Sequence, residues 1–208
     1  MANLDLALMV RGVDALLRQR QHIHEFSEDQ ECLFRIAVSE ARAHIRLSDG
    51  TSIRLGDPIL ELHLWNEHVP TMPSAGPSAA WANLMKRMIR RSLILTALYL
   101  EQERALASIV AVHGAPPFRS RLGAPQMIRA AQRFGFDLIE PDVRASFGER
   151  IHELFDSMLL WGLVLAFNPS AQRCGTILRH RYHLWISRQK LFYCFGGDVN
   201  GHSGAQSG

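Results

Sequence analysis

The chain has 208 residues, of which 47% are apolar and 21% are charged, and this balance is typical of a globular protein. It excludes wholesale disorder and a fibrous chain. The formal net charge is only +3, which lacks the strong basic bias of a nucleic-acid-binding protein, so we expect no nucleic-acid partner. Of the basic residues, 21 are arginine and two are lysine. This bias either marks an anionic partner or reflects codon usage.

Cysteine content and hydropathy bear on the compartment. The three cysteines, Cys32, Cys174 and Cys194, are odd in number and widely spaced, so we expect neither a disulfide framework nor a cysteine zinc site. No apolar run approaches the ~20 residues of a membrane-spanning helix. The N-terminus also lacks the basic and apolar regions of an export signal. We therefore expect a cytoplasmic protein, with peripheral contact at the inner membrane left open.

The first third of the chain predicts a helix followed by strands. Residues 1–30 have the pattern of an N-terminal amphipathic helix and a loop. Alternating apolar and polar residues then predict strands at 34–38, on both sides of Asp49-Gly50, and at 59–65. Because Asp-Gly between two alternating runs is a strong hairpin signal, these strands are expected to form a small antiparallel meander.

The rest of the chain predicts mainly helices. In order, the pattern indicates a helix at 79–104 capped by Ser78, a β-α-β unit at 107–140, a helix at 146–167, a strand at 182–187 and a short helix from Ser187 to Phe195. Residues 197–208 are rich in glycine and serine and are predicted to be disordered. We infer a single α+β domain over residues 31–196, in which a small antiparallel sheet or meander packs with several helices.

Common catalytic signatures are missing from the sequence. It contains no phosphate-binding glycine loop, no zincin motif and no nucleophile-elbow motif. No local pair of histidines has the spacing of a zinc site, so we expect no metal and no cofactor. A site assembled from His63, His113 and His183 stays open as an alternative, because strand ends can converge in a pocket.

The strongest local cluster of polar residues lies at the end of the third predicted strand. Alternation places Glu61, His63 and Trp65 on one face, and Asn66 follows. Such a face is suited to binding a sugar, by stacking on Trp65 and hydrogen bonds from His63 and Asn66. A carboxylate beside an imidazole is also the minimum requirement for acid–base catalysis. The structural alternative is a covered face, with Trp65 in the core and His63 bonded to a backbone carbonyl.

Four basic residues gather on the helix predicted at 79–104. Lys86, Arg87, Arg90 and Arg91 precede a strongly apolar stretch. Each basic residue close to an anionic leaflet contributes ~1 kcal/mol, so these four are candidates for membrane contact. The alternative is a solvated helix face whose later turns enter the core.

Two stretches of the chain resemble a known family. Leu47-Ser-Asp-Gly-Thr51, Gly56-Asp57 and Leu62-His-Leu-Trp-Asn66, together with the C-terminal Leu184–Leu191, are similar to the signature of the YkoP-like domain family. The resemblance implies a domain over residues 31–196 and a link to polysaccharide deacetylases, glycosyltransferases and glycans of the cell envelope. It supplies no catalytic residue, and the third position of the family's His-Leu-x-Asn motif is here Trp65.

These observations leave the question of enzymatic activity open. The first hypothesis is a non-catalytic accessory protein for synthesis or modification of an envelope polysaccharide or glycolipid, which binds glycan or a partner enzyme. The alternative is a small hydrolase or transferase acting on a sugar or lipid carrier. In it, His63 is the general base, oriented by Glu61 or Asp57. A third option is a membrane-associated structural protein. The candidate ligand-binding residues are His63, Trp65, Asn66, Arg181 and His183. The accessory role adds Asp57 to the recognition surface. In the enzymatic role, Arg150 is an alternative to Arg181 for holding an anionic group.

Overall fold

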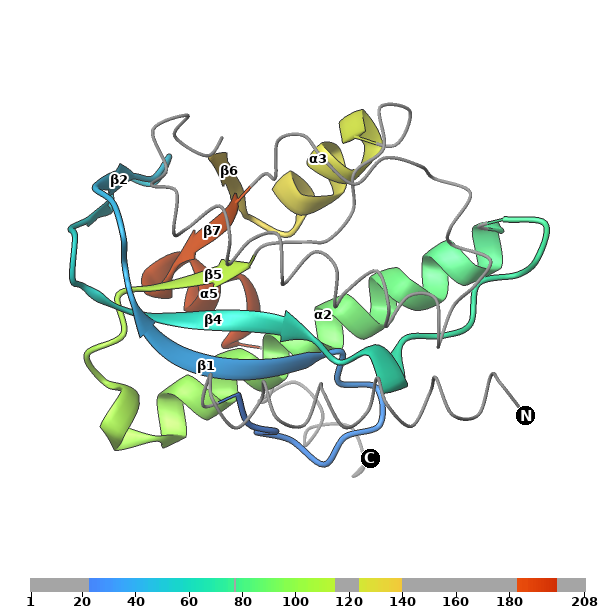
Figure 1. Ribbon diagram of the computed structural model, residues 1–208, viewed down its shortest axis with the longest axis horizontal. Coiled ribbons are helices and arrows are strands. Elements are labelled where there is room, and N and C mark those ends of the chain that lie inside the picture. The colour runs from blue at the N-terminus through green and yellow to red at the C-terminus, as the bar shows by residue number, and fades with distance from the viewer. Residues whose placement is uncertain (1–22, 77, 115–123, 140–182, 198–208) are drawn as a thin grey trace, which may run out of the picture.

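The structure is a computed structural model that describes residues 23–76, 78–114, 124–139 and 183–197 (Figure 1). A five-stranded sheet forms its centre, in the spatial order β1-β4-β5-β7-β6, and a two-stranded hairpin, β2-β3, extends from it. The strands are β1 (Phe34–Glu40), β2 (Ile45–Arg46), β3 (Ser52–Ile53), β4 (Pro58–Leu64), β5 (Ala111–Gly114), β6 (Asp137–Ile139) and β7 (His183–Ser187). The α-helices are α2 (Ala79–Gln102), α3 (Ala124–Arg133) and α5 (Arg188–Phe195), and short 3₁₀ helices lie at Asn66–His68 and Arg104–Leu106.

The predicted α+β class is confirmed, and the sheet is mixed. β4 and β5 pair in parallel, whereas the other neighbours in the sheet pair antiparallel. A parallel pair needs a long connection, and α2 supplies it between β4 and β5. The predicted β-α-β unit is present in split form, because β7 lies between β5 and β6.

Local sequence signals account for the turns and helix starts. The hairpin β2-β3 turns at Gly50, whose φ of 87° is favourable only for glycine, and Asp49 accepts a hydrogen bond from the Thr51 amide at 2.9 Å. Ser78 accepts from the Trp81 amide at 3.1 Å, and Ser187 accepts from the Lys190 amide at 2.9 Å, as predicted for helix caps. The strand expected from residue 107 begins only at Ala111, because backbone hydrogen bonds hold 104–109 in turns.

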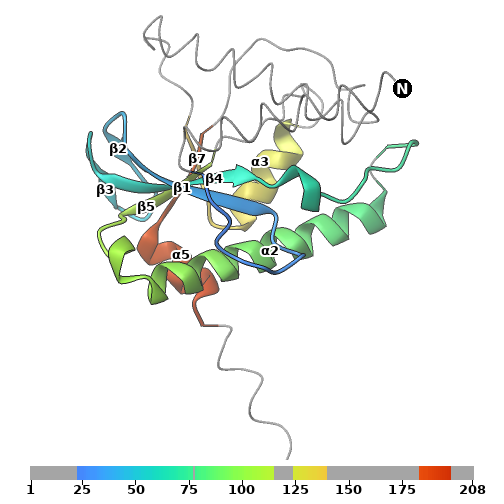
Figure 2. The same ribbon diagram turned by 60° about the horizontal axis from the view of Figure 1, so that its bottom comes forward.

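One face of the sheet packs against α2 and α5, which lie on the same side of it (Figure 2). The buried core there combines strand and helix residues, namely Ile36, Leu60, Val112, Ile186, Leu93, Ala97, Leu100 and Leu191. Among the described residues, no helix is long and apolar enough to cross a membrane. The N-terminal helix, the helix at 146–167 and the tail that the sequence predicts fall on residues outside the described ranges.

Candidate acid–base site

The sheet face opposite α2 and α5 carries polar side chains from three neighbouring strands. Glu61 of β4 pairs with His113 of β5, and His113 pairs with Trp185 of β7. Side chains along a strand alternate between the two faces of the sheet, and the preceding residues, Leu60 and Val112, lie in the core that the helices cover. Glu61, His113 and Trp185 therefore lie side by side on the other face.

Glu61 is the centre of this group. Its Oε1 accepts a hydrogen bond from the Ser39 hydroxyl at 2.8 Å, and its Oε2 lies 3.5 Å from Nε2 of His63. Nδ1 of His113 lies 3.9 Å from Oε1. Burial by itself raises the pKa of Glu61, but the contacts with His113, His63 and Ser39 outweigh it and hold the pKa well below its usual value. The carboxylate is therefore ionised at neutral pH and faces two imidazoles.

His63 presents one nitrogen to Glu61 and part of its ring to solvent. Its Nε2 is inaccessible to solvent and makes no ordinary hydrogen bond, so its contact within the described part of the chain is the 3.5 Å approach to Glu61. The side chain is nevertheless 32% exposed. The exposed surface belongs to other atoms of the side chain. This arrangement orients the ring by its buried nitrogen and leaves another part of the side chain accessible.

A second pair of imidazoles adjoins Glu61. Nε2 of His113 lies 2.9 Å from Nδ1 of His183, which is a hydrogen bond between strands β5 and β7. The His113 ring also stacks on Trp185 with 4.4 Å between ring centroids. The histidines considered as an assembled site, His63, His113 and His183, are thus connected through Glu61. Within the described ranges, no group of three or more side chains has the arrangement of a metal site.

Other residues singled out from the sequence lie away from this group. Asp57 accepts a hydrogen bond from the Arg54 amide at 2.7 Å and closes the turn between β3 and β4. Trp65 is only 9% exposed, stacks on His68 at 3.7 Å and lies 4.7 Å below the Arg35 guanidinium. These contacts agree with the structural alternative given above, in which Trp65 belongs to the core.

Three more predicted ligand residues have no described side chain. Asn66 begins the 3₁₀ helix Asn66–His68, and only its backbone is described. Arg150 and Arg181 fall outside the described residues. The proposed role of each stays a prediction.

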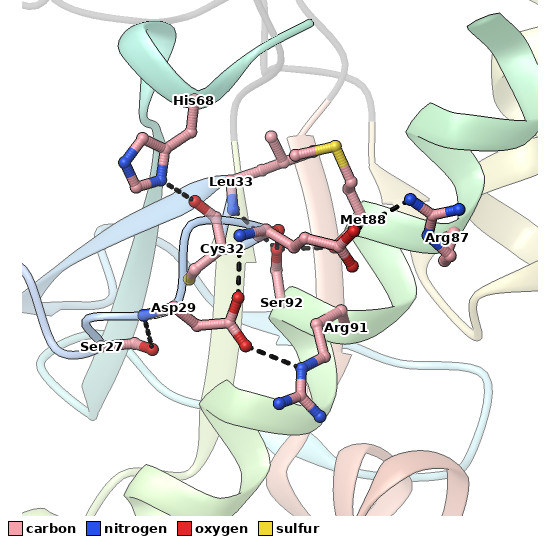
Figure 3. Close-up of polar contacts among 10 residues, drawn as sticks. Ser27, Asp29, Cys32, Leu33, His68, Arg87, Met88, Arg91 and Ser92 are labelled. Atoms are coloured by element: carbon pink, nitrogen blue, oxygen red, sulfur yellow. Dashed lines mark hydrogen bonds and ion pairs between the residues drawn. The ribbon is translucent and has the colours of Figure 1, made fainter.

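The basic residues of α2 hold a loop as well as facing solvent (Figure 3). Arg87 pairs with Glu31 and Arg91 pairs with Asp29, each at 2.9 Å, and all four basic residues are exposed. The pKa of Asp29 lies below its usual value, first because its carboxylate accepts the Glu31 amide and also because of Arg91. At least two of the four predicted membrane-contact charges, Arg87 and Arg91, are therefore balanced by acidic partners.

The sequence interpretation missed Ser39 and Trp185 as members of the site. Ser39 reaches Glu61 across the antiparallel pair β1-β4, and Trp185 reaches His113 across β5-β7. Both contacts depend on the register between strands distant in sequence. The alternation in residues 34–40 and 183–187 could have assigned each residue to a face, but not to a neighbour.

Comparisons with known proteins show what the chain is similar to. A family model described as the YkoP domain matches residues 6–194. The uncharacterized protein YkoP of Bacillus subtilis (strain 168) is 23% identical over 133 residues, which are 63% of this chain and 68% of that protein. No solved structure gives a significant match.

Proposed function

The chain belongs to the YkoP domain family, and we propose that it is a small enzyme, a hydrolase or transferase that acts on a sugar or lipid carrier. The observation that supports this proposal most is the contact of one ionised carboxylate, Glu61, with the imidazoles of both His63 and His113. Carboxylates that orient an imidazole and stabilise its protonated form are a recurring basis of general acid–base catalysis. The sugar or lipid class rests on the resemblance in the sequence.

In the proposed mechanism, His63 is the general base. Its Nε2 carries a hydrogen toward Glu61, so Nδ1 holds the lone pair and takes a proton from a substrate hydroxyl or a water molecule. The imidazolium that forms is stabilised by the adjacent carboxylate, which the Ser39 hydroxyl holds in place at 2.8 Å. The attacking oxygen uses the electron pair of its former O–H bond to form a bond to the substrate carbon, and the bond from that carbon to the leaving oxygen breaks as the leaving oxygen takes up a proton.

Mutagenesis with generic chromogenic substrates tests this proposal. The native chain is assayed with p-nitrophenyl acetate and with a p-nitrophenyl glycoside, and His63→Ala is expected to lower turnover by about 10²–10⁴-fold. His44→Ala is the matched control, because His44 is an exposed histidine outside the group, and it should retain full turnover. Turnover that survives His63→Ala, or no turnover of either probe by the native chain, would overturn the enzymatic proposal.

A non-catalytic accessory role is the second candidate, and the exposed Lys86 on α2 favours it. In this role the protein docks at the anionic cytoplasmic face of the inner membrane, beside a glycan-modifying enzyme or a glycosyltransferase. Flotation with vesicles that contain anionic lipid tests the docking step. Binding should be weakened in Lys86→Glu and retained in Arg91→Gln, whose charge is already paired with Asp29. Equal binding of both variants would refute it.

A further inference from the structure

The hairpin β2-β3 carries arginines on the face that it turns away from the sheet. Its inner face packs on the sheet through Ile45 and Ile53. Side chains alternate between the two faces of a strand, so Arg46 and Arg54, which follow these isoleucines, lie on the outer face. Both are exposed, as is Arg42 just before β2, and within the described part of the chain none of the three forms an ion pair. Because a guanidinium keeps its charge at any physiological pH, the outer face presents three positive charges to solvent.

The acidic residues of the hairpin lie at its two ends, where they hold the turns. Asp49 accepts hydrogen bonds from the Thr51 amide and from the Ser187 hydroxyl of β7. Asp57 accepts a hydrogen bond from the Arg54 amide at 2.7 Å. Both carboxylates are thus engaged with backbone amides or with the neighbouring strand. These bonds fix the hairpin at both ends, so the arginines between them stand on a rigid surface.

An exposed leucine adjoins the arginines. Leu55 is 63% exposed and occupies the second position of a four-residue turn, in which the Asp57 amide donates to the Arg54 carbonyl at 3.0 Å. The third position is Gly56, whose φ of 87° suits this kind of turn. The Gly56 amide donates to the Ala41 carbonyl at 2.8 Å, which places the turn beside the segment that enters β2. A large apolar side chain is therefore presented to solvent between the two segments that carry the arginines.

We infer that this hairpin surface, formed by Arg42, Arg46, Arg54 and Leu55, docks on a membrane that contains anionic lipid. Guanidinium groups pair with the phosphates of lipid headgroups, and an apolar side chain beside them enters the boundary between headgroups and acyl chains. A soluble polyanion would contact the arginines and leave the leucine in water, so the exposed Leu55 favours a lipid partner. The hairpin surface is distinct from the basic residues of α2, because the hairpin and the N-terminal half of α2 lie at opposite ends of the described structure (Figures 1 and 2).

Vesicle flotation with the full chain tests the hairpin surface, and it needs no turnover, so its outcome is independent of the enzymatic proposal. The probes are vesicles of phosphatidylcholine alone and vesicles that also contain phosphatidylglycerol, and we expect the native chain to bind only the second kind. Each arginine close to an anionic leaflet strengthens binding about fivefold, so the triple variant Arg42→Gln/Arg46→Gln/Arg54→Gln should bind about 100-fold more weakly. Leu55→Ser should bind about tenfold more weakly, because it removes the apolar side chain that enters the membrane.

Arg104→Gln is the matched control, because Arg104 is an exposed arginine outside the hairpin, and this variant should bind as the native chain does. All the variants replace exposed side chains, so they should keep the native melting temperature. Native binding by the triple variant, or no binding of the native chain to the anionic vesicles, overturns the proposal. Native binding by Leu55→Ser together with weak binding by the triple variant overturns the assignment to lipid, since the surface then recognises charge alone, as in a soluble polyanion.

Discussion

The hydroxyl of Ser92 joins α2 to the start of β1, and its removal should lower the free energy of unfolding by more than the small size of the group suggests. Ser92 Oγ accepts the Leu33 amide at 2.7 Å and donates to the Met88 carbonyl at 2.7 Å (Figure 3). Both Ser92 and Leu33 are 0% exposed. In Ser92→Ala no water reaches the Leu33 N–H, so a buried donor loses its acceptor.

The expected magnitude follows from that unsatisfied donor. A buried polar group left without a partner costs about 1–3 kcal/mol. For a chain of this size, each kcal/mol corresponds to about 2–4 °C in the melting temperature. A central value of about 2 kcal/mol therefore predicts a fall in the melting temperature of about 4–8 °C.

Thr96→Val is the matched control for this experiment. Thr96 is equally buried on the same helix, and its hydroxyl donates to the Ser92 carbonyl at 2.8 Å in the same i−4 geometry. That carbonyl lies within the backbone hydrogen bonds of the helix, so removing the Thr96 hydroxyl should lower the free energy of unfolding by less than about 1 kcal/mol. Urea unfolding measures both variants, and hydrogen exchange of the Leu33 amide should accelerate only in Ser92→Ala. Equal destabilisation by the two variants, or unchanged exchange at Leu33, would refute the reasoning.

Three further predictions concern the polar contacts elsewhere. Ser187→Ala removes the cap of α5 and the hydrogen bond to Asp49, and should lower the free energy of unfolding by about 1–2 kcal/mol in urea titrations. Burial alone would raise the pKa of Asp49, but the hydrogen bonds from Ser187 and Thr51 lower it by a larger amount, so the pKa in the folded state lies below that in the unfolded state. Stability from Asp49 is thus present above the unfolded pKa of about 3.9 and lost as the pH falls through the folded pKa. Asp49→Asn keeps a good hairpin turn and should show a shallower loss of stability in acid; an equal loss would contradict the assignment. Arg91→Gln should change the free energy of unfolding by less than about 1 kcal/mol, with no difference left in 1 M salt, because its pair with Asp29 is at the surface; a salt-independent loss of 2 kcal/mol or more would show that the pair is effectively buried.

The sequence predicted the elements whose causes are local. The Asp49-Gly50 hairpin and the caps at Ser78 and Ser187 each depend on a few neighbouring residues. The order of strands in the sheet depends instead on contacts between distant segments. The parallel pairing of β4 with β5 and the insertion of β7 between β5 and β6 follow from packing on α2 and α5, which no local pattern encodes.

The candidate site shows the same division. Alternation along β4 correctly placed Glu61 and His63 on one face, because period two is a local property of a strand. It also placed Trp65 there, but the strand ends at Leu64, and the indole packs between His68, three residues on, and Arg35 of β1. The bond from His113 to His183 joins residues 70 positions apart. It requires the register of β5 on β7, and sequence spacing alone could give it only as an open alternative.

Two of the motifs that carry the family resemblance, Leu47–Thr51 and Leu184–Leu191, meet in the structure, and their contacts explain a scaffolding role. At the tip of the hairpin, Ser48 donates to Asp137 of β6 at 2.6 Å, and Asp49 accepts from Ser187 at the end of β7. Lys190 of α5 donates to Ser48 at 3.2 Å. The hairpin therefore fixes β6, β7 and the start of α5 relative to one another. Since β7 also carries His183, a motif distant from the imidazoles sets the register on which their hydrogen bond depends.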